Sequence, residues 1–196
     1  MTLFGLTGGI GTGKSTLALG LTGRGVPVVD TDNVARELVA PGQPANLQIR
    51  ARFGPEVFDA DNRLQREKLG ELIFRDLAAR VALEEILHPL IRATWQRVVS
   101  GWREGGIHCG VVVIPLLFET NAASAFDRII CTACSDGAQA IRLAERGWDA
   151  AHVQARLQAQ WPLAKKMAAS DHVVWSEGPK ELLLAQAARI GLPTVN

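Results

Sequence analysis

The sequence predicts a layered α/β fold in which about five parallel strands form a sheet flanked by helices. Short apolar runs without polar alternation recur along the chain, which is typical of strands buried on both faces of a parallel sheet. Segments with a helical hydrophobic period separate these runs, as the crossovers between parallel strands require. A glycine-rich stretch follows the first run directly, and a ligand-binding turn is expected at such a strand end.

The expected strands follow one another at regular intervals. They are residues 3–6, 26–29, 111–114, 129–131 and 173–175. Between the first two, residues 14–21 have a helical pattern in which Leu17, Ala18 and Leu21 share one side. This order of strand, helix and strand predicts a βαβ unit at the start of the chain.

A long interval after the second strand, residues 33–100, predicts a helical insert. It opens with a Pro/Gly-rich break at residues 40–44 and continues with a mostly helical pattern. One apolar stripe follows the spacing of a core-facing helix, and its members are Leu83, Ile86, Leu87, Leu90 and Ile91. Pro89 interrupts this stripe, so we expect a kink there.

A second long interval, residues 136–170, is helical and polar, with Gly147 and Pro162 as breaks. We interpret it as a mobile lid. The whole chain is then a single domain whose core, insert and lid alternate along the sequence. The expected core is 1–32, 101–135 and 171–196, the helical insert is 33–100, and the lid is 136–170.

Composition limits the classes of protein to which the chain can belong. Its 196 residues carry a formal charge of +1, with 47% hydrophobic and 21% charged residues, as in an ordinary globular protein. The near-neutral charge disfavours a nucleic-acid partner, and no apolar stretch is long enough to span a membrane. Three cysteines cannot form a disulfide framework, so we expect a cytoplasmic protein.

The strongest motif lies at residues 8–15, which match the phosphate-binding pattern G-x-x-x-x-G-K-[ST] in a strand–loop–helix setting. Glycines let backbone N–H groups surround phosphate oxygens, and the helix that follows adds its positive end. Lys14 is expected to reach the β- and γ-phosphates, and the Ser15 hydroxyl to ligate Mg²⁺. The residues expected to bind the nucleotide are Gly9, Gly11, Thr12, Gly13, Lys14, Ser15 and Thr16. The motif predicts a nucleoside-triphosphate site in a P-loop NTPase fold.

Two carboxylates, Asp30 and Asp32, follow the second expected strand. In an extended chain they would share one face at the sheet edge where ligands bind. A carboxylate there could accept the proton of an attacking hydroxyl or hold metal-bound water. The alternative is that one of them only caps a helix starting near Asn33.

Several segments, taken in order, resemble the dephospho-CoA kinase family. They read GLTGGIGTGKST (5–16), VVDTDNVARELVAPG (28–42), HPLIR (88–92), PLLFE (115–119), QAIRLAER (139–146) and AQWPLAKKMAASDHVV (159–174). The resemblance implies ATP-dependent phosphorylation of the 3′-hydroxyl of the dephospho-CoA ribose, the last step of coenzyme A synthesis. It also implies ATP as co-substrate with Mg²⁺, dephospho-CoA as the small-molecule partner, and substrate binding by the helical insert 33–100. The sequence gives no sign of an obligate protein partner.

The resemblance also implies residue roles. Asp32 falls on the second acid of the family's D-x-D pattern and is the expected activator of the 3′-hydroxyl. Arg36, one helical turn on, is a candidate substrate contact. His88 begins the family's H-P pair, and it is either a substrate contact or a core or capping histidine beside the kink. The other residues expected on the substrate side are Thr7, Pro115, Leu116, Leu117 and Phe118, with Glu119 as a supporting acid.

Two basic pairs lie in the expected lid. Arg142 and Arg146 are four residues apart and would face the same side of a helix, where they could close over the triphosphate. Arg142 is expected to act with Lys14 and Asp32 in catalysis by neutralising charge on the transferring group. The alternative is a solvated basic face. The same two interpretations apply to the pair at residues 165 and 166.

Some features depart from the family pattern. Ser176 stands where family members often have an Asn, and Trp161 stands where Met is common. The third expected strand holds no acid, so Mg²⁺ would be held by Ser15, phosphates and waters, with Asp32 as a further candidate. The C-x-x-C spacing of Cys131 and Cys134 has no metal-site partner, and we interpret both as small residues at a strand end.

Other functions remain open at this point. Another small-molecule P-loop kinase, of nucleoside, shikimate or gluconate type, would share the core and differ in its acceptor pocket. A regulatory GTPase would need an N-K-x-D string, which the sequence does not contain. A nucleic-acid-stimulated ATPase is disfavoured by the net charge of +1.

Overall fold

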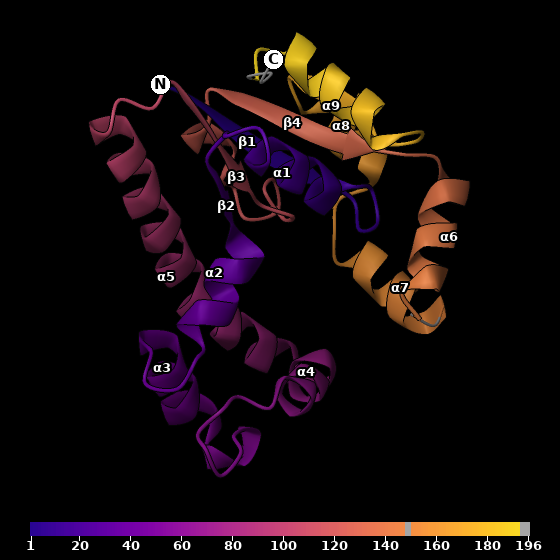
Figure 1. The fold of residues 1–196 in the computed structure, drawn as a ribbon. Helices are drawn as coiled ribbons and strands as arrows, with labels where there is room; N and C mark the ends of the chain where they lie inside the picture. The colour runs from indigo at the N-terminus through magenta and orange to yellow at the C-terminus, as the bar shows by residue number, and fades with distance from the viewer. Residues whose placement is uncertain (148–149, 193–196) are drawn as a thin grey trace. The chain divides into compact units, whose positions relative to one another are not determined.

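The computed structural model describes residues 1–147 and 150–192, and within them five strands form one sheet of order β2-β3-β1-β4-β5 (Figure 1). The strands are β1 (Thr2–Gly8), β2 (Val28–Asp30), β3 (Cys109–Val113), β4 (Arg128–Ala133) and β5 (His172–Trp175). The pairs of β1 with β3, β1 with β4, and β4 with β5 are all parallel. The predicted fold class and strand number are confirmed.

Strand β1 is the centre of the sheet. Leu6 pairs in register with Val113 of β3 and with Ile130 of β4, and none of the three exposes more than 2% of its surface. Such strands are covered on both faces, which is why their sequences show no polar alternation. The carboxyl end of β1 is therefore held rigidly between two neighbours, and the glycine-rich loop starts there.

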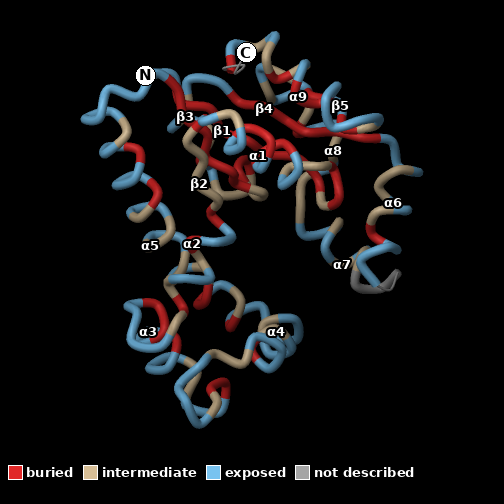
Figure 2. The backbone as a smooth tube through the Cα atoms, viewed as in Figure 1, coloured by how far each residue is buried: buried red, intermediate tan, exposed pale blue. Residues whose placement is uncertain are grey.

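Helices cover this sheet and complete its core. Helix α1 (Lys14–Thr22) contacts α9 (Lys180–Arg189), and Leu17, Leu21 and Leu184 join the buried cluster of the sheet (Figure 2). Helix α8 (Leu163–Ala168) packs against β1 and β4. The predicted side of α1 is confirmed, since Leu17, Ala18 and Leu21 are all buried.

The segment between β4 and α8 is helical, as expected. It contains α6 (Asp136–Glu145), which Ser135 caps through a bond to the Ala138 N–H, and α7 (Ala150–Gln158). Gly147 has a φ of 72° just after α6, and Pro162 stands at the N-cap of α8. A short 3₁₀ turn, η2 (Ala123–Ala125), precedes β4.

The chain divides into two compact units. Unit 1 is Met1–Val29 with the chain from Trp102 onwards, and unit 2 is Asp30–Gly101. Unit 2 is built from helices, with one isolated antiparallel bridge between Phe58 and Leu64. Its helical elements are α2 (Thr31–Leu38), α3 (Pro44–Phe53), the 3₁₀ turn η1 (Pro55–Val57), α4 (Arg66–Arg75) and most of α5 (Leu77–Glu104).

Unit 2 has its own hydrophobic core, centred on Ile49 and Leu83. The stripe predicted for the long helix lies in α5, where Leu83 is buried and Ile86, Leu87 and Leu90 pack partly buried against this core. Helix α5 continues through Pro89.

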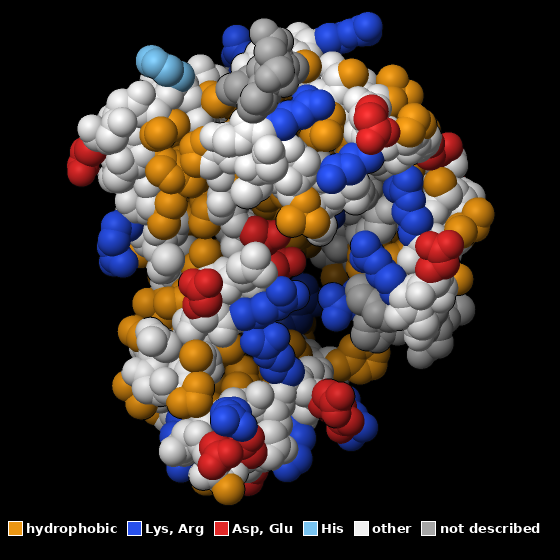
Figure 3. All heavy atoms as spheres, in the orientation of Figure 1, with side chains coloured by type: hydrophobic (Ala, Val, Ile, Leu, Met, Phe, Trp, Pro, Cys, Tyr) orange, Lys and Arg blue, Asp and Glu red, His pale blue; other side chains and the backbone are white. Residues whose placement is uncertain are grey.

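The mixture of positive and negative side chains on the surface agrees with the near-neutral net charge of the sequence (Figure 3). Lys and Arg side chains occur with Asp and Glu side chains on the face shown in Figure 3. Among the described helices, none combines the length and apolar character that a membrane span requires.

Candidate active site

The glycine-rich motif forms the turn between β1 and α1. Gly8, Gly11 and Gly13 all have positive φ angles, of 147°, 74° and 91°. Gly13 is the N-cap of α1 and, as a glycine, has no side chain that could cap the helix, and the first turn holds no acid. Ser15 and Thr16 are exposed in that turn. An anion at this position would meet the backbone N–H groups of the first turn and the positive end of the helix.

Gly8 and Gly13 are required both by their positive φ angles and by neighbouring atoms that leave no space for a Cβ. A Cβ on Gly8 would lie 2.5 Å from the Thr132 carbonyl oxygen, and one on Gly13 would lie 2.7 Å from the Ser176 Cβ. The loop therefore packs directly on the ends of β4 and β5, and only glycine fits at both positions.

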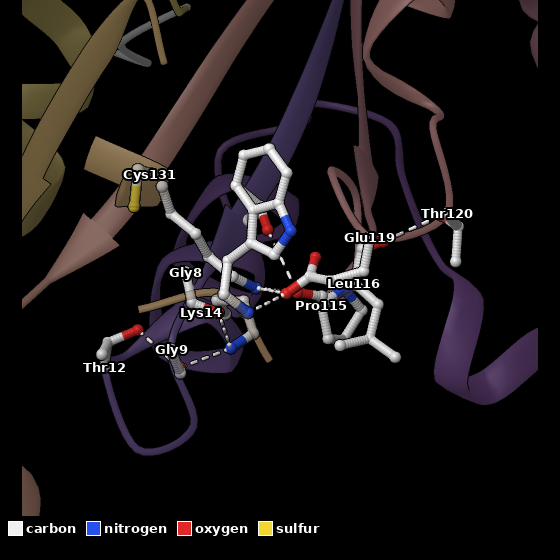
Figure 4. A network of polar contacts seen from close by, with 12 residues as sticks. Gly8, Gly9, Thr12, Lys14, Pro115, Leu116, Glu119, Thr120 and Cys131 are labelled. Atoms are coloured by element: carbon white, nitrogen blue, oxygen red, sulfur yellow. Dashed lines mark hydrogen bonds and ion pairs between the residues drawn. The ribbon is translucent and has the colours of Figure 1, made fainter. Parts of the chain in front are cut away.

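Polar contacts within the loop fix its shape. Thr12 is fully buried, and its hydroxyl donates to the Gly9 carbonyl at 2.8 Å and lies 3.0 Å from the Thr132 hydroxyl. Lys14 Nζ donates to the carbonyls of Gly8 and Gly9 at 3.0 and 2.7 Å (Figure 4). The lysine therefore holds its ammonium group against the start of the loop.

Helix α6 braces the other side of the loop. Gln139 Nε2 donates to the Ile10 carbonyl at 2.6 Å, and Arg142 Nη1 donates to the Gly11 carbonyl at 3.2 Å. Arg142 also donates to the Ser176 hydroxyl at 2.8 Å and to the Ser176 carbonyl at 2.6 Å. The solvated-face alternative is therefore wrong for Arg142, whereas Arg146 is exposed at the end of α6.

The contacts of Ser176 and Gln139 were not predicted from sequence. Ser176 is buried after β5, and Arg142 joins it to the loop by donating both to Ser176 and to the Gly11 carbonyl. The next residue, Glu177, accepts a hydrogen bond from the Ser135 backbone, and this bond lowers the pKa of the Glu177 carboxyl below its usual range. The pattern gave no signal for these contacts, because they join three segments far apart in the chain.

The end of β3 meets α8 in a second polar network (Figure 4). Lys166 is fully buried, forms an ion pair with Glu119 at 2.9 Å, and donates to the Pro115 carbonyl at 2.7 Å. The Thr7 hydroxyl donates to the same Pro115 carbonyl at 3.2 Å. The supporting role expected for Glu119 agrees with this contact. The solvated-face alternative is wrong for Lys166, because its side chain is fully buried, whereas closure over a triphosphate stays a prediction.

Trp161 extends this network. Its backbone N–H donates to Glu119 at 2.7 Å, and its ring stacks on Phe118 with centroids 5.4 Å apart. Lys165 Nζ lies 3.5 Å from the centroid of the Trp161 ring, so this lysine makes a cation–π contact. Leu117 is fully buried and Leu116 partly so, which makes the 115–118 segment a packed one.

The cysteines of the C-x-x-C spacing are both buried thiols at the end of β4. Burial raises the pKa of Cys131 to about 11, although Lys166 and then Lys14 oppose the shift. Such thiols are poor nucleophiles. No group of three or more potential metal-binding His, Cys, Asp or Glu side chains occurs in the described part of the chain.

In unit 2, the two carboxylates after β2 have separate roles. Helix α2 begins at Thr31, Asp30 caps it by accepting from the Asp32 N–H at 2.8 Å, and Asp32 lies exposed in the first turn. The expectation that both would alternate in an extended chain is wrong, because the capping bond starts the helix two residues before Asn33.

The other two candidates in unit 2 lie on helix surfaces. Arg36 is exposed on α2 and donates to Asn33 at 3.0 Å. His88 is exposed on α5, so the alternative of a core histidine is wrong.

A parallel sheet of order β2-β3-β1-β4-β5 and a loop of this geometry after its central strand define the class of P-loop kinases. The family model described as dephospho-CoA kinase matches residues 2–180. The chain belongs to the dephospho-CoA kinase family.

Individual relatives agree with this family. The chain is 39% identical to a dephospho-CoA kinase of Geobacillus kaustophilus, over 92% of this chain and 91% of the relative. It is 40% identical to a dephospho-CoA kinase of Anaeromyxobacter dehalogenans, over 97% and 90%. A solved protein from Thermus thermophilus superimposes with a TM-score of 0.84, at 29% identity and 98% coverage of both chains.

Proposed function

We propose that the chain transfers the γ-phosphate of ATP to the 3′-hydroxyl of dephospho-CoA, giving coenzyme A and ADP. The observation that carries this proposal is membership of the family over almost the whole chain, up to residue 180. The alternative of a nucleoside, shikimate or gluconate kinase shares the core of unit 1 but not the family's other segments.

The nucleotide would bind at the turn between β1 and α1. Backbone N–H groups of the loop and of the first turn of α1, which begins at Lys14, are proposed as donors for the phosphate oxygens. Lys14 already holds its ammonium group beside Gly8 and Gly9, so its charge lies at the loop that would receive the triphosphate. Little rearrangement of the loop is then needed on binding.

A magnesium ion fits the donors present. The Ser15 hydroxyl is exposed in the first turn of α1, and a hard cation accepts hydroxyl, phosphate and water oxygens as ligands. Ser15 would hold the ion together with the nucleotide, with Asp32 as a further candidate ligand. When bound, the ion supplies positive charge to the β- and γ-phosphate oxygens.

On the acceptor side, Asp32 is the proposed base for the 3′-hydroxyl. Asp32 lies exposed in the first turn of α2, where its carboxylate is accessible to a substrate. Arg36 and His88 are proposed substrate contacts in unit 2, and both are exposed. In unit 1, Thr7 and the segment 115–118 are proposed to form the substrate wall.

We further propose that residues 136–170 act as a lid in which α7 and the end of α6 move. Arg142 ties α6 to the loop, and α8 packs on the sheet around Lys166, so neither attachment is loose. The hydrogen bonds of Arg142 to Gly11 and Ser176 hold its guanidinium beside the loop, where its charge is proposed to act on the nucleotide phosphates. Arg146, exposed at the end of α6, would join on closure.

The enzyme is proposed to work in the cytoplasm. All three cysteines are unpaired thiols, as expected in a reducing compartment. Its partner in this proposal is the small-molecule substrate, without nucleic acid or an obligate protein partner.

A screen of acceptors tests the proposal. ADP release from ATP and Mg²⁺ would be measured with dephospho-CoA, adenosine, shikimate and gluconate in turn, with the Lys14→Ala variant as the control for contaminating activity. We expect turnover with dephospho-CoA that Lys14→Ala lacks, with the product carrying its new phosphate on the 3′ position. Turnover with another acceptor, and none with dephospho-CoA, would overturn the assignment.

A further inference from the structure

Lys166 is a charged residue for which the phosphoryl-transfer proposal gives no role. It exposes 0% of its surface, and it is the largest fully buried side chain among the described residues. Its ammonium group bonds to Glu119 Oε1 at 2.9 Å and to the Pro115 carbonyl at 2.7 Å. A lysine in such a position requires an explanation, since buried ion pairs are poor sources of net stability.

The Pro115 carbonyl joins this pair to the nucleotide side. It accepts from Lys166 and also from the hydroxyl of Thr7, the residue directly before the phosphate loop. Lys14 in turn holds the carbonyl of Gly8, the residue after Thr7. Figure 4 shows the loop residues and the end of β3 in this network. The position of Pro115 is thus fixed from two directions.

Glu119 joins the pair to the chain that enters α8. Its Oε1 atom accepts both from Lys166 and from the Trp161 N–H, so one oxygen joins the end of β3 to residue 161. The Trp161 ring lies between Phe118 and Lys165, which keeps the side chain of Phe118 in place. The whole segment from Pro115 to Glu119 is therefore held at both ends by charged or aromatic contacts.

We propose that Glu119 and Lys166 are positioning residues for the acceptor: they fix the 115–118 segment against the phosphate loop, so that dephospho-CoA binds in line with the nucleotide. This inference rests on the proposed function, because it takes that segment as the acceptor wall. The pair acts through Pro115 and Phe118 and touches neither substrate. Its loss lowers the use of the acceptor and leaves ATP binding largely unchanged.

Variants that remove one or both charges of the pair separate its proposed positioning role from its contribution to stability. Lys166→Met leaves a buried carboxylate without its cation and is expected to destabilise the protein. The double variant Glu119→Gln/Lys166→Met removes both charges, and its Gln carbonyl can still accept from the Trp161 N–H. Replacing a whole buried pair by neutral groups commonly restores stability. Leu183→Ala, a cavity in the core beside α9, is the control for destabilisation alone.

The experiment measures thermal midpoints and steady-state constants for both substrates in the wild type and these variants. We expect the double variant to regain the thermal midpoint that Lys166→Met loses. We also expect its kcat/KM for dephospho-CoA to stay about 10- to 100-fold below wild type, as for a misplaced substrate. Its KM for ATP should change less than about threefold. Leu183→Ala should keep near-normal constants at a lowered thermal midpoint.

Two outcomes would overturn this inference. One is recovery of kcat/KM together with stability in the double variant, and the other is an equal loss for ATP and for the acceptor. If Lys166→Met does not fold, the double variant alone decides between them. A wild-type protein that does not use dephospho-CoA would instead overturn the proposed function itself, together with this inference.

Discussion

At the residue scale, cations near the carboxyl end of β1 are held by backbone carbonyl groups. Lys14 bonds to Gly8 and Gly9, and Arg142 bonds to Gly11 and Ser176. These carbonyl groups orient the two cations beside the phosphate loop. A chain with a net charge of only +1 can therefore still place cations where a triphosphate is expected to bind.

Asp32 is the residue whose replacement tests the chemistry most directly. In Asp32→Asn the helix should be preserved, because Asp30 accepts from the backbone N–H of Asp32 and not from its side chain. Loss of a general base costs roughly 100- to 10,000-fold in rate, so kcat should fall by that order while ATP affinity stays near normal. Single-turnover phosphoryl transfer and nucleotide binding would be measured, with Asp61→Asn, also in unit 2, as the control. A normal kcat in Asp32→Asn would remove Asp32 from the role of base.

Arg142 offers a second test at this scale. Arg142→Ala removes the hydrogen bonds to Gly11 and Ser176 and one charge beside the loop. If the guanidinium acts mainly on the transferring group, kcat should fall by about 100-fold or more, with a smaller change in the Kd of ATP. The control is Arg189→Ala on the exposed last turn of α9. If both variants changed kcat equally, Arg142 would have no larger role in catalysis than an exposed surface arginine.

At the scale of elements, the strands and the phosphate loop could be predicted, because local pattern determines them. A buried strand such as residues 111–114 can be identified from its own apolar residues, and the spacing of the glycines identifies the phosphate loop. Helix α2 begins earlier than expected, because Asp30 caps the helix at the point where an extended chain had been expected. The burial of Lys166 could not be predicted. Its partner Glu119 is 47 residues away in the chain, and two adjacent lysines usually indicate a solvated face.

Helix α5 allows an element-scale prediction. Pro89 lies inside the helix, where it supplies no N–H group for the carbonyl one turn earlier. Pro89→Ala restores that donor at an exposed position, and the gain is reduced by the greater freedom of the unfolded chain. We expect the free energy of unfolding to rise by about 1–2 kcal/mol. Urea denaturation followed by circular dichroism measures the change, and an unchanged or lower value would show that the helix needs the proline at this point.

At the scale of the whole molecule, the chain combines a parallel-sheet unit and a helical unit, each with its own core. The interval 33–100 was expected to form a helical insert, and some seventy residues are enough to bury a core of their own. The second long interval, 136–170, belongs to unit 1. The ligands of the exposed residues in unit 2, such as Arg36 and His88, could not be predicted. A local pattern shows that a helical residue is exposed but not what it binds.

The buried thiols make the stability of the molecule depend on alkaline pH. Burial raises the pKa of Cys131 from 9.0 to about 11, so between these values the unfolded chain has lost this proton while the folded chain still holds it. The unfolded state then binds fewer protons, and the free energy of unfolding must fall as the pH rises. For Cys131 alone the loss is about 2–3 kcal/mol by pH 11.

Urea titrations at intervals from pH 8 to pH 11 would measure this loss, and the sequence favours the experiment because it contains no tyrosine to ionise in the same range. Cys131→Ala is the matched variant, and its stability should decline less steeply over the interval than that of the wild type. Cys109 and Cys134, whose pKa values burial also raises, remain in both proteins and cancel in the comparison. Parallel pH profiles for the two proteins would show that the Cys131 thiol ionises alike in the folded and unfolded chains.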